Sequence, residues 1–122
     1  MQTKQNISYY ALVGMIEPPK KMIENNQREK VDKIVDVVCS FYGVERSEVV
    51  SDSRRRNLCL CRHVITHLIR ERTKMGFKDI GRLLGGRDHT TSINSIRALR
   101  GWLETDFYLA QQINLIKRLL DA

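Results

Sequence analysis

The chain has 122 residues and a formal net charge of +7 at pH 7, a length that suits one small domain with a modest core. No apolar run is long enough to cross a membrane, and three cysteines, an odd number, argue against a disulfide framework and for a reducing compartment. The apolar stretch Ile7–Ile16 leads into Glu17-Pro18-Pro19 without a small-residue cleavage site, so it does not read as a signal peptide. We therefore expect a cytoplasmic protein.

An N-terminal arm, residues 1–26, precedes a predicted domain, residues 27–122. Pro18 and Pro19 mark the separation, because neither can donate a backbone hydrogen bond and both restrict their neighbours. The structure of the arm stays open; a strand is one interpretation, which rests on Ile7, Tyr9, Tyr10 and Val13. Its aromatic residues make the arm a candidate for self-association, and the oligomeric state is otherwise undetermined.

The domain begins with a predicted helix over Gln27–Tyr42, which Gly43 can end in a left-handed conformation. Apolar residues recur along it with the 3.6-residue period of one helix face, namely Val31, Ile34, Val35, Val38 and Phe41. The stretch Glu45–Val50 then predicts one short helical turn that buries Val49 and Val50.

Two further long helices are predicted. The first covers Arg62–Met75 and is stopped by Gly76; its buried stripe is Val64, Ile65, Leu68 and Ile69. The last covers Asp106–Leu120, with Thr105 as its cap, and buries Phe107, Ala110, Ile113, Ile116 and Leu120. The pattern predicts an all-α fold, a small helical bundle.

The most informative stretch lies between these helices. Lys78–Leu84 predicts a short amphipathic helix, and Gly85-Gly86 predicts a tight turn. A second helix follows, with Asp88 suited to be its N-cap and with a stripe of Ile93, Ile96, Leu99 and Leu103. Helix, glycine turn and helix form the helix-turn-helix pattern, in which the second helix enters the DNA major groove.

Charge is concentrated around this pattern. Between Arg54 and Arg100 there are twelve Lys and Arg against three Asp and Glu, an excess of nine, which leaves minus two of the total of +7 for the rest of the chain. A basic block on an otherwise balanced protein indicates a polyanionic partner. Double-stranded DNA is therefore the expected partner, and no membrane association is expected.

The run Gly85–Thr91 resembles the signature of the C-terminal DNA-binding domain of the bacterial replication initiator DnaA. The flanks agree, since Arg54-Arg55-Arg56 and Arg62-His63 stand where that family has a basic loop and an arginine-led helix. The resemblance runs from about Val31 to Leu120. It implies sequence-specific binding of a short A/T-rich site, the DnaA box, in replication initiation or its regulation.

The resemblance also implies roles for single residues. Asp88, His89 and Thr90 would meet base edges, and Arg54 would enter the neighbouring minor groove, whose negative potential attracts arginine where it is narrow. Contacts to the DNA backbone would come from Arg62, His63, Arg70 and Thr91, to which we add Lys78. Arg62 and Arg70 lie eight residues apart, so a helix projects both toward nearly the same, DNA-facing side.

Four positions depart from the family pattern. His63 stands where glutamine is usual, Cys61 where a helix-starting proline is common, and Leu60 where another basic residue is common. Ser92 replaces an apolar residue at the start of the recognition helix. These departures bear on the affinity for DNA and on the preferred site.

The chain contains no Gly-x-x-x-x-Gly-Lys-Ser/Thr loop for nucleotide phosphates, and Gly85-Gly86 is followed by Arg87 instead. We therefore expect a DNA-binding domain alone, with no nucleotide, no other cofactor and no ATP-driven opening of an origin. No catalytic residue is expected either. Asp88 and His89 are adjacent, and neighbouring helix residues do not face each other.

A zinc site is an alternative for part of this region. Cys59, Cys61, His63 and His67 offer four ligands within nine residues, and the two histidines share one helix face. Cys59 and Cys61 are nevertheless only two residues apart, and ligands so crowded rarely close a tetrahedron. We expect no metal, with both cysteines acting as small, partly apolar residues.

Other functions also fit. A mobile-element or phage replication factor, an antagonist that occupies DnaA boxes, and a transcriptional regulator of an unrelated operator would all use this domain. A protein-binding adaptor is the alternative from a different class. It would use Tyr9-Tyr10 and Trp102, since aromatic residues are enriched at interfaces, although a lone tryptophan is more often a core residue.

Overall fold

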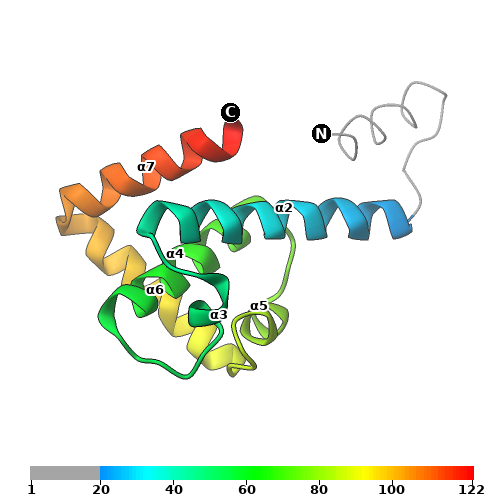
Figure 1. Cartoon of the computed structure of the whole chain (residues 1–122), viewed down its shortest axis with the longest axis horizontal. Coiled ribbons are helices and arrows are strands. Elements are labelled where there is room, and N and C mark those ends of the chain that lie inside the picture. Colours follow the sequence, from blue (N-terminus) through cyan, green and yellow to red (C-terminus); the bar gives the residue numbers. More distant parts are fainter. Residues whose placement is uncertain (1–19) are drawn as a thin grey trace.

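The computed structural model describes the backbone of residues 20–122 and the side chains of residues 26–122. Every regular element in this range is a helix, which confirms the all-α prediction (Figure 1). The strand and self-association expected for the arm lie outside the described residues. In chain order the helices are α2 Lys20–Tyr42, α3 Arg46–Val49, α4 Arg56–Arg72, α5 Phe77–Leu83, α6 His89–Thr105 and α7 Phe107–Asp121.

Helix α2 is longer than the apolar period predicts, because it begins at Lys20 and not at Gln27. The expected domain start therefore falls inside a helix. The predicted inner face is confirmed, since Val31, Ile34, Val35 and Val38 are all buried. Gly43 follows α2 with φ +67°, the left-handed conformation that ends a helix cheaply at glycine.

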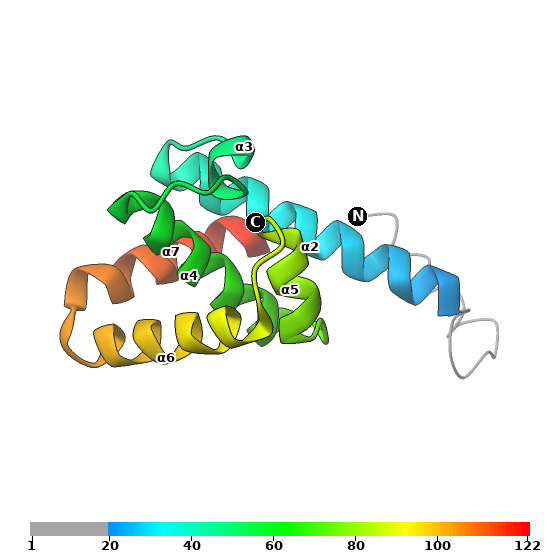
Figure 2. The same cartoon turned by 90° about the horizontal axis from the view of Figure 1, so that it is seen from below.

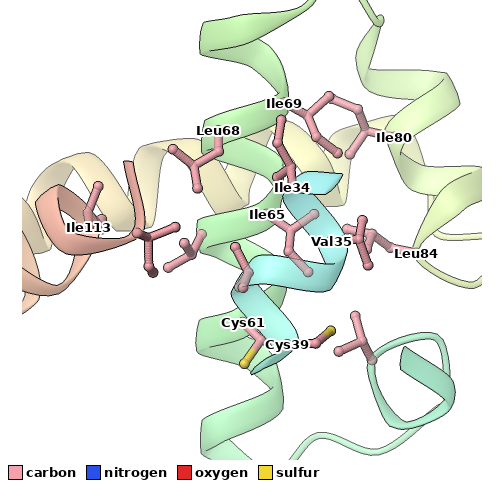
Figure 3. Packing of buried hydrophobic residues seen from close by; sticks show 14 of the residues in the cluster. Ile34, Val35, Cys39, Cys61, Ile65, Leu68, Ile69, Ile80, Leu84 and Ile113 are labelled. Atoms are coloured by element: carbon pink, nitrogen blue, oxygen red, sulfur yellow. The ribbon is translucent and has the colours of Figure 1, made fainter. Parts of the chain in front are cut away.

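Helix α4 is the centre of the core and packs against α2 on one side and α6 on the other. Figure 3 shows Cys61, Ile65, Leu68 and Ile69 of α4 meeting side chains of α2, α5 and α7. Leu58, Ile65 and Leu68 have no exposed surface. Burying one such side chain contributes about 1.5–3 kcal/mol, so the apolar face of α4 contributes much of the stability of the core.

The predicted limits of α4 are wrong at both ends. The helix begins at Arg56, because Leu58 and Cys61 extend the buried stripe toward the N-terminus. It ends at Arg72, where Thr73 adopts an extended conformation. Gly76 does not stop α4; its φ of −77° is ordinary, and it precedes the first residue of α5 as the N-cap.

Helix α7 runs back beside α2 (Figure 1). Lys33 Nζ donates to Leu120 O at 2.8 Å, and Tyr42 OH donates to Gln112 Oε1 at 3.0 Å. The cap of α7 is Asp106 and not Thr105, since the Asp106 carboxylate accepts a bond from Leu109 N at 3.0 Å.

Four apolar side chains are more exposed than expected, of which Ala110 is half-buried. Phe107 is 71% exposed, because α7 starts there and turns this position outward. Val50 is 39% exposed, whereas Val49 is buried as predicted. Trp102 is 45% exposed, so it is not a core residue.

Candidate nucleic-acid interface

Helices α5 and α6 form a helix-turn-helix around two glycines (Figure 2). Gly85 and Gly86 have φ of +99° and +79°, a region that side chains disfavour. The turn lies close against α5, since Arg87 N donates to Gly81 O at 2.8 Å. A Cβ at Gly81 would fall inside van der Waals contact with Arg87 O. Glycine at three positions therefore permits this geometry.

The start of α6 is capped as predicted. The Asp88 side chain accepts a bond from Thr90 N at 3.1 Å, and the same oxygen, Oδ1, lies 2.8 Å from His89 Nδ1. The expectation that Asp88 and His89 do not face each other is wrong. Asp88 has φ −63° and ψ 149°, outside the helix, which lets its carboxylate turn back over the first helical residue.

The four polar residues at this end of α6 are accessible. Asp88, His89, Thr90 and Thr91 are all exposed, while Ser92 and Ser95 are buried. The N–H groups of Thr90, Thr91 and Ser92 already donate to Asp88, the first to its carboxylate at 3.1 Å and the other two to its backbone oxygen at 3.0 and 3.4 Å. This end of α6 therefore presents a carboxylate, an imidazole and two hydroxyls to solvent.

The basic loop, residues 50–55 between α3 and α4, borders the same region. Arg54 is exposed, whereas Arg55 is paired with Glu48 at 2.8 Å. A pocket of about 550 Å³ separates the loop from α6, and its lining includes Arg54, His63 and Thr91. The basic loop and the start of α6 thus flank one hollow on the same face.

Arg62 does not lie where the helix period places it. Its side chain is 5% exposed, so the expectation that it faces solvent beside Arg70 is wrong. Nε donates to Val49 O at 2.7 Å and Nη1 to Ser53 O at 2.7 Å. Nη2 donates to Ser51 O at 3.0 Å and Glu48 O at 3.3 Å. The buried guanidinium therefore holds the basic loop in place through these hydrogen bonds.

Arg87 is a residue that sequence reasoning did not single out. It is half-buried; Nη1 donates to Leu84 O and Nη2 donates to Ser51 O at 2.8 Å. Burial, followed by the nearby charge of Arg62, lowers its pKa from the ordinary arginine value. Both acceptors are backbone carbonyls, so no side chain in the sequence indicates a partner for Arg87. The sequence signal for this role is that Arg87 directly follows the glycine turn.

His63 is half-buried beside α6. Its ring centroid lies 5.3 Å from that of Trp102, and its Nδ1 is buried without a hydrogen-bond partner among the described residues. Burial, followed by the charge of Arg62, lowers the pKa of His63. In the free protein the lowered pKa favours the uncharged ring.

The remaining expected contact residues lie farther along the bundle. Arg70 is exposed near the C-terminal end of α4, where Nη1 donates to Met75 O at 3.0 Å and the guanidinium lies 4.3 Å from the ring centroid of Phe77. A cation over an aromatic face is favourable, so Arg70 is held in place. Lys78 is exposed on α5.

The four candidate zinc ligands do different things. Cys61 is buried in the core, where desolvation raises the pKa of its thiol to about 11. His67 Nε2 lies 3.5 Å from the Glu71 carboxylate. Among the residues that the structure describes, no group of three or more His, Cys, Asp or Glu is arranged to hold a metal.

Within the same range, no helix combines the length and apolarity that a membrane crossing needs.

Comparison of the chain with known proteins shows which proteins it is similar to. The family model described as bacterial dnaA protein helix-turn-helix matches residues 31–99. The chromosomal replication initiator protein DnaA of Rhizobium johnstonii and that of Rhizobium meliloti are each 36% identical over 110 residues, 90% of this chain and 21% of theirs. The protein of that name from Xanthobacter autotrophicus is 36% identical over 93 residues, 76% of this chain and 18% of its own. The chain spans about a fifth of the length of these curated relatives, and it belongs to the bacterial DnaA helix-turn-helix family.

Proposed function

We propose that this protein binds double-stranded DNA in a sequence-specific manner, at a short A/T-rich site similar to a DnaA box, in replication initiation or its regulation. One observation carries the proposal: the exposed polar start of α6 and the exposed Arg54 of the basic loop flank one hollow on the same face. This arrangement supports a binding mode in which the start of α6 enters the major groove and Arg54 enters the adjacent minor groove.

Base reading falls to Asp88, His89 and Thr90. Asp88 uses Oδ1 for the cap and the histidine, which leaves Oδ2 to accept from an exocyclic amine of cytosine. His89 Nδ1 lies 2.8 Å from the Asp88 carboxylate, which orients the ring and leaves Nε2 to face a base edge. The methyl group of Thr90 can pack against the methyl group of thymine.

Phosphate contacts supply affinity without sequence choice. We assign them to the side chains of Thr91, Arg70 and Lys78, because these residues are exposed. His63 would contribute as a hydrogen-bond donor. Arg62 is left out of this set, since its donors are already engaged by four carbonyl oxygens.

Two measurements test the proposal. Selection from a random duplex pool should recover an A/T-rich site, which would favour replication-linked roles over an unrelated operator. With three cationic contacts, Arg54, Arg70 and Lys78, log affinity should fall against log salt with a slope of about −3, from roughly −0.9 per contact. Absence of duplex binding at low salt, or a flat salt response, would refute the proposal.

A protein-binding adaptor is the second candidate, and one specific feature favours it. Phe107 and Tyr108 are 71% and 78% exposed at the start of α7, and Leu115 and Leu119 are half exposed farther along the same helix. A complex held by this apolar surface should persist in high salt, whereas a DNA complex should dissociate.

A further inference from the structure

Two guanidinium groups meet at one carbonyl oxygen of the basic loop. Ser51 O accepts from Arg62 Nη2 at 3.0 Å and from Arg87 Nη2 at 2.8 Å. Arg62 comes from the central helix α4, whereas Arg87 comes from the turn of the helix-turn-helix. One oxygen thus joins three parts of the molecule that lie far apart in the sequence.

Each arginine is anchored on its own side. Arg62 also holds Val49 O and Ser53 O, so it grips the loop on both sides of Ser51. Arg87 is fixed to the turn through its own backbone N–H and through Leu84 O. Two like charges this close repel each other, and the carbonyl dipoles of the loop offset that repulsion.

The glycine turn also approaches the loop directly. A Cβ at Gly85 would fall inside van der Waals contact with Val50 O. The loop and the turn are therefore in contact through backbone atoms, and the two arginines hold that contact closed.

We propose that Arg62 and Arg87 are positioning residues, which fix the basic loop against the helix-turn-helix so that Arg54 and the start of α6 reach their grooves at a set offset. This inference rests on the proposed DNA binding. A loop held in its bound conformation before binding avoids the entropy cost of ordering. The two residues would act on specificity without touching a base.

Lysine is the informative replacement. It keeps the positive charge but offers a compact ammonium in place of a planar fork of five N–H donors. If Arg62 acted as a phosphate contact, Arg62→Lys would retain most of the affinity. If Arg62 positions the loop, the compact ammonium of Arg62→Lys cannot reach all four carbonyl oxygens at once, and the loop becomes more mobile.

The test is a double-mutant cycle on the preferred duplex. Arg54→Ala should weaken binding about 10-fold, within the ~1–3 kcal/mol of a specific contact, and Arg62→Lys should weaken it by a similar factor. The double variant should bind no more weakly than Arg54→Ala alone, because Arg54, the side chain that the loop places in the minor groove, is already absent. Additive losses, or wild-type affinity of Arg62→Lys, would overturn the inference.

Site selection with the same variants adds a readout that general destabilisation would not move. Arg62→Lys and Arg87→Lys should each lose base preference at the minor-groove flank and keep the preference read by α6. Loss of preference at all positions alike would contradict a positioning role. Arg72→Lys is the matched control, since Arg72 pairs with Asp121 at 2.6 Å, away from the loop. It should leave affinity and preference unchanged.

Amide hydrogen exchange of the free protein keeps the inference testable without DNA. Residues 50–55 should exchange faster in Arg62→Lys and Arg87→Lys than in Arg72→Lys, and unchanged exchange in both would overturn it. Thermal melting of each variant identifies any that does not fold. If wild-type protein binds no duplex, the proposed function fails and this inference with it; if wild-type binds and the losses add, the inference alone fails.

Discussion

His89 Nδ1 lies 2.8 Å from Asp88 Oδ1, although the two residues are adjacent in sequence. The contact exists because Asp88 stands just outside α6 and its carboxylate caps the helix. Capping the helix and orienting the imidazole are therefore done by one oxygen. Stability and base reading are coupled at this position, and substitutions can separate them.

Asp88→Ala and Asp88→Asn should differ. Alanine removes the cap and should lower the free energy of unfolding by about 0.5–2 kcal/mol. Asparagine is an equally good cap and should preserve stability, but its uncharged amide should alter the base preference. Urea denaturation with site selection measures both effects. Equal stability losses in the two variants would show that Asp88 does not stabilise the protein as a cap.

His89→Ala and Arg70→Ala should fail in different ways. The His89 side chain is 61% exposed, so its loss should leave the fold intact and cost about 1–3 kcal/mol on the preferred duplex. Non-specific binding should hardly change. Arg70→Ala should weaken specific and non-specific binding alike and flatten the salt slope by about one unit. Proportional losses in both variants would contradict this division of roles.

Arg62→Ala should destabilise the protein itself. The change leaves Val49 O and Ser53 O without their Arg62 donors, and we expect the free energy of unfolding to fall by about 1–3 kcal/mol. Arg56→Ala is the matched control, because Arg56 is exposed at the start of the same helix; its effect should stay within about 0.5 kcal/mol. Chemical denaturation of both variants decides the matter.

Stability should depend on pH through the half-buried histidines. Burial lowers the pKa of His63 and of His67 in the folded state below the ordinary value of about 6.5. Between the folded and unfolded pKa values the unfolded chain binds more protons, so stability rises with pH in that window. It should be lost as the pH falls from about 6.5 toward the folded pKa values.

His63→Gln isolates the share of one ring. Compared with wild type, this variant should lose less stability between pH 7.5 and 5, because one of the two shifted groups is gone. Carboxylates that titrate in the same range are common to both proteins and cancel in the difference. Urea unfolding at the two pH values measures the effect. An identical loss in the variant would show that the burial of His63 contributes nothing to acid sensitivity.

Local patterns predict much of this fold, because the features they encode are local. The buried stripe of α4, the left-handed Gly43 and the Asp88 cap each depend on neighbours within a helical turn or two. The burial of Arg62 could not be predicted in this way. Its acceptors, among them Val49 O and Ser51 O, precede α4 and lie several helical turns away from Arg62 in the sequence. The predicted burial of Phe107 is wrong for another reason. Apolar residues are frequent on protein surfaces, so apolarity alone does not imply burial.

Two glycine-to-alanine changes test how closely α5 and the turn must approach. In Gly81→Ala the new Cβ would meet Arg87 O, a backbone atom that cannot rotate away, so the turn must shift from α5. We expect a loss of about 1–3 kcal/mol in the free energy of unfolding, as for overpacking, and a weaker preference for the selected site.

In Gly101→Ala the new Cβ on α6 meets nothing within 4 Å. This change should stabilise the protein by about 0.5–1 kcal/mol, because alanine loses less conformational freedom in a helix. Opposite signs for the two variants, measured by urea denaturation, would support the close approach; stabilisation by Gly81→Ala would show that α5 and the turn are not in contact.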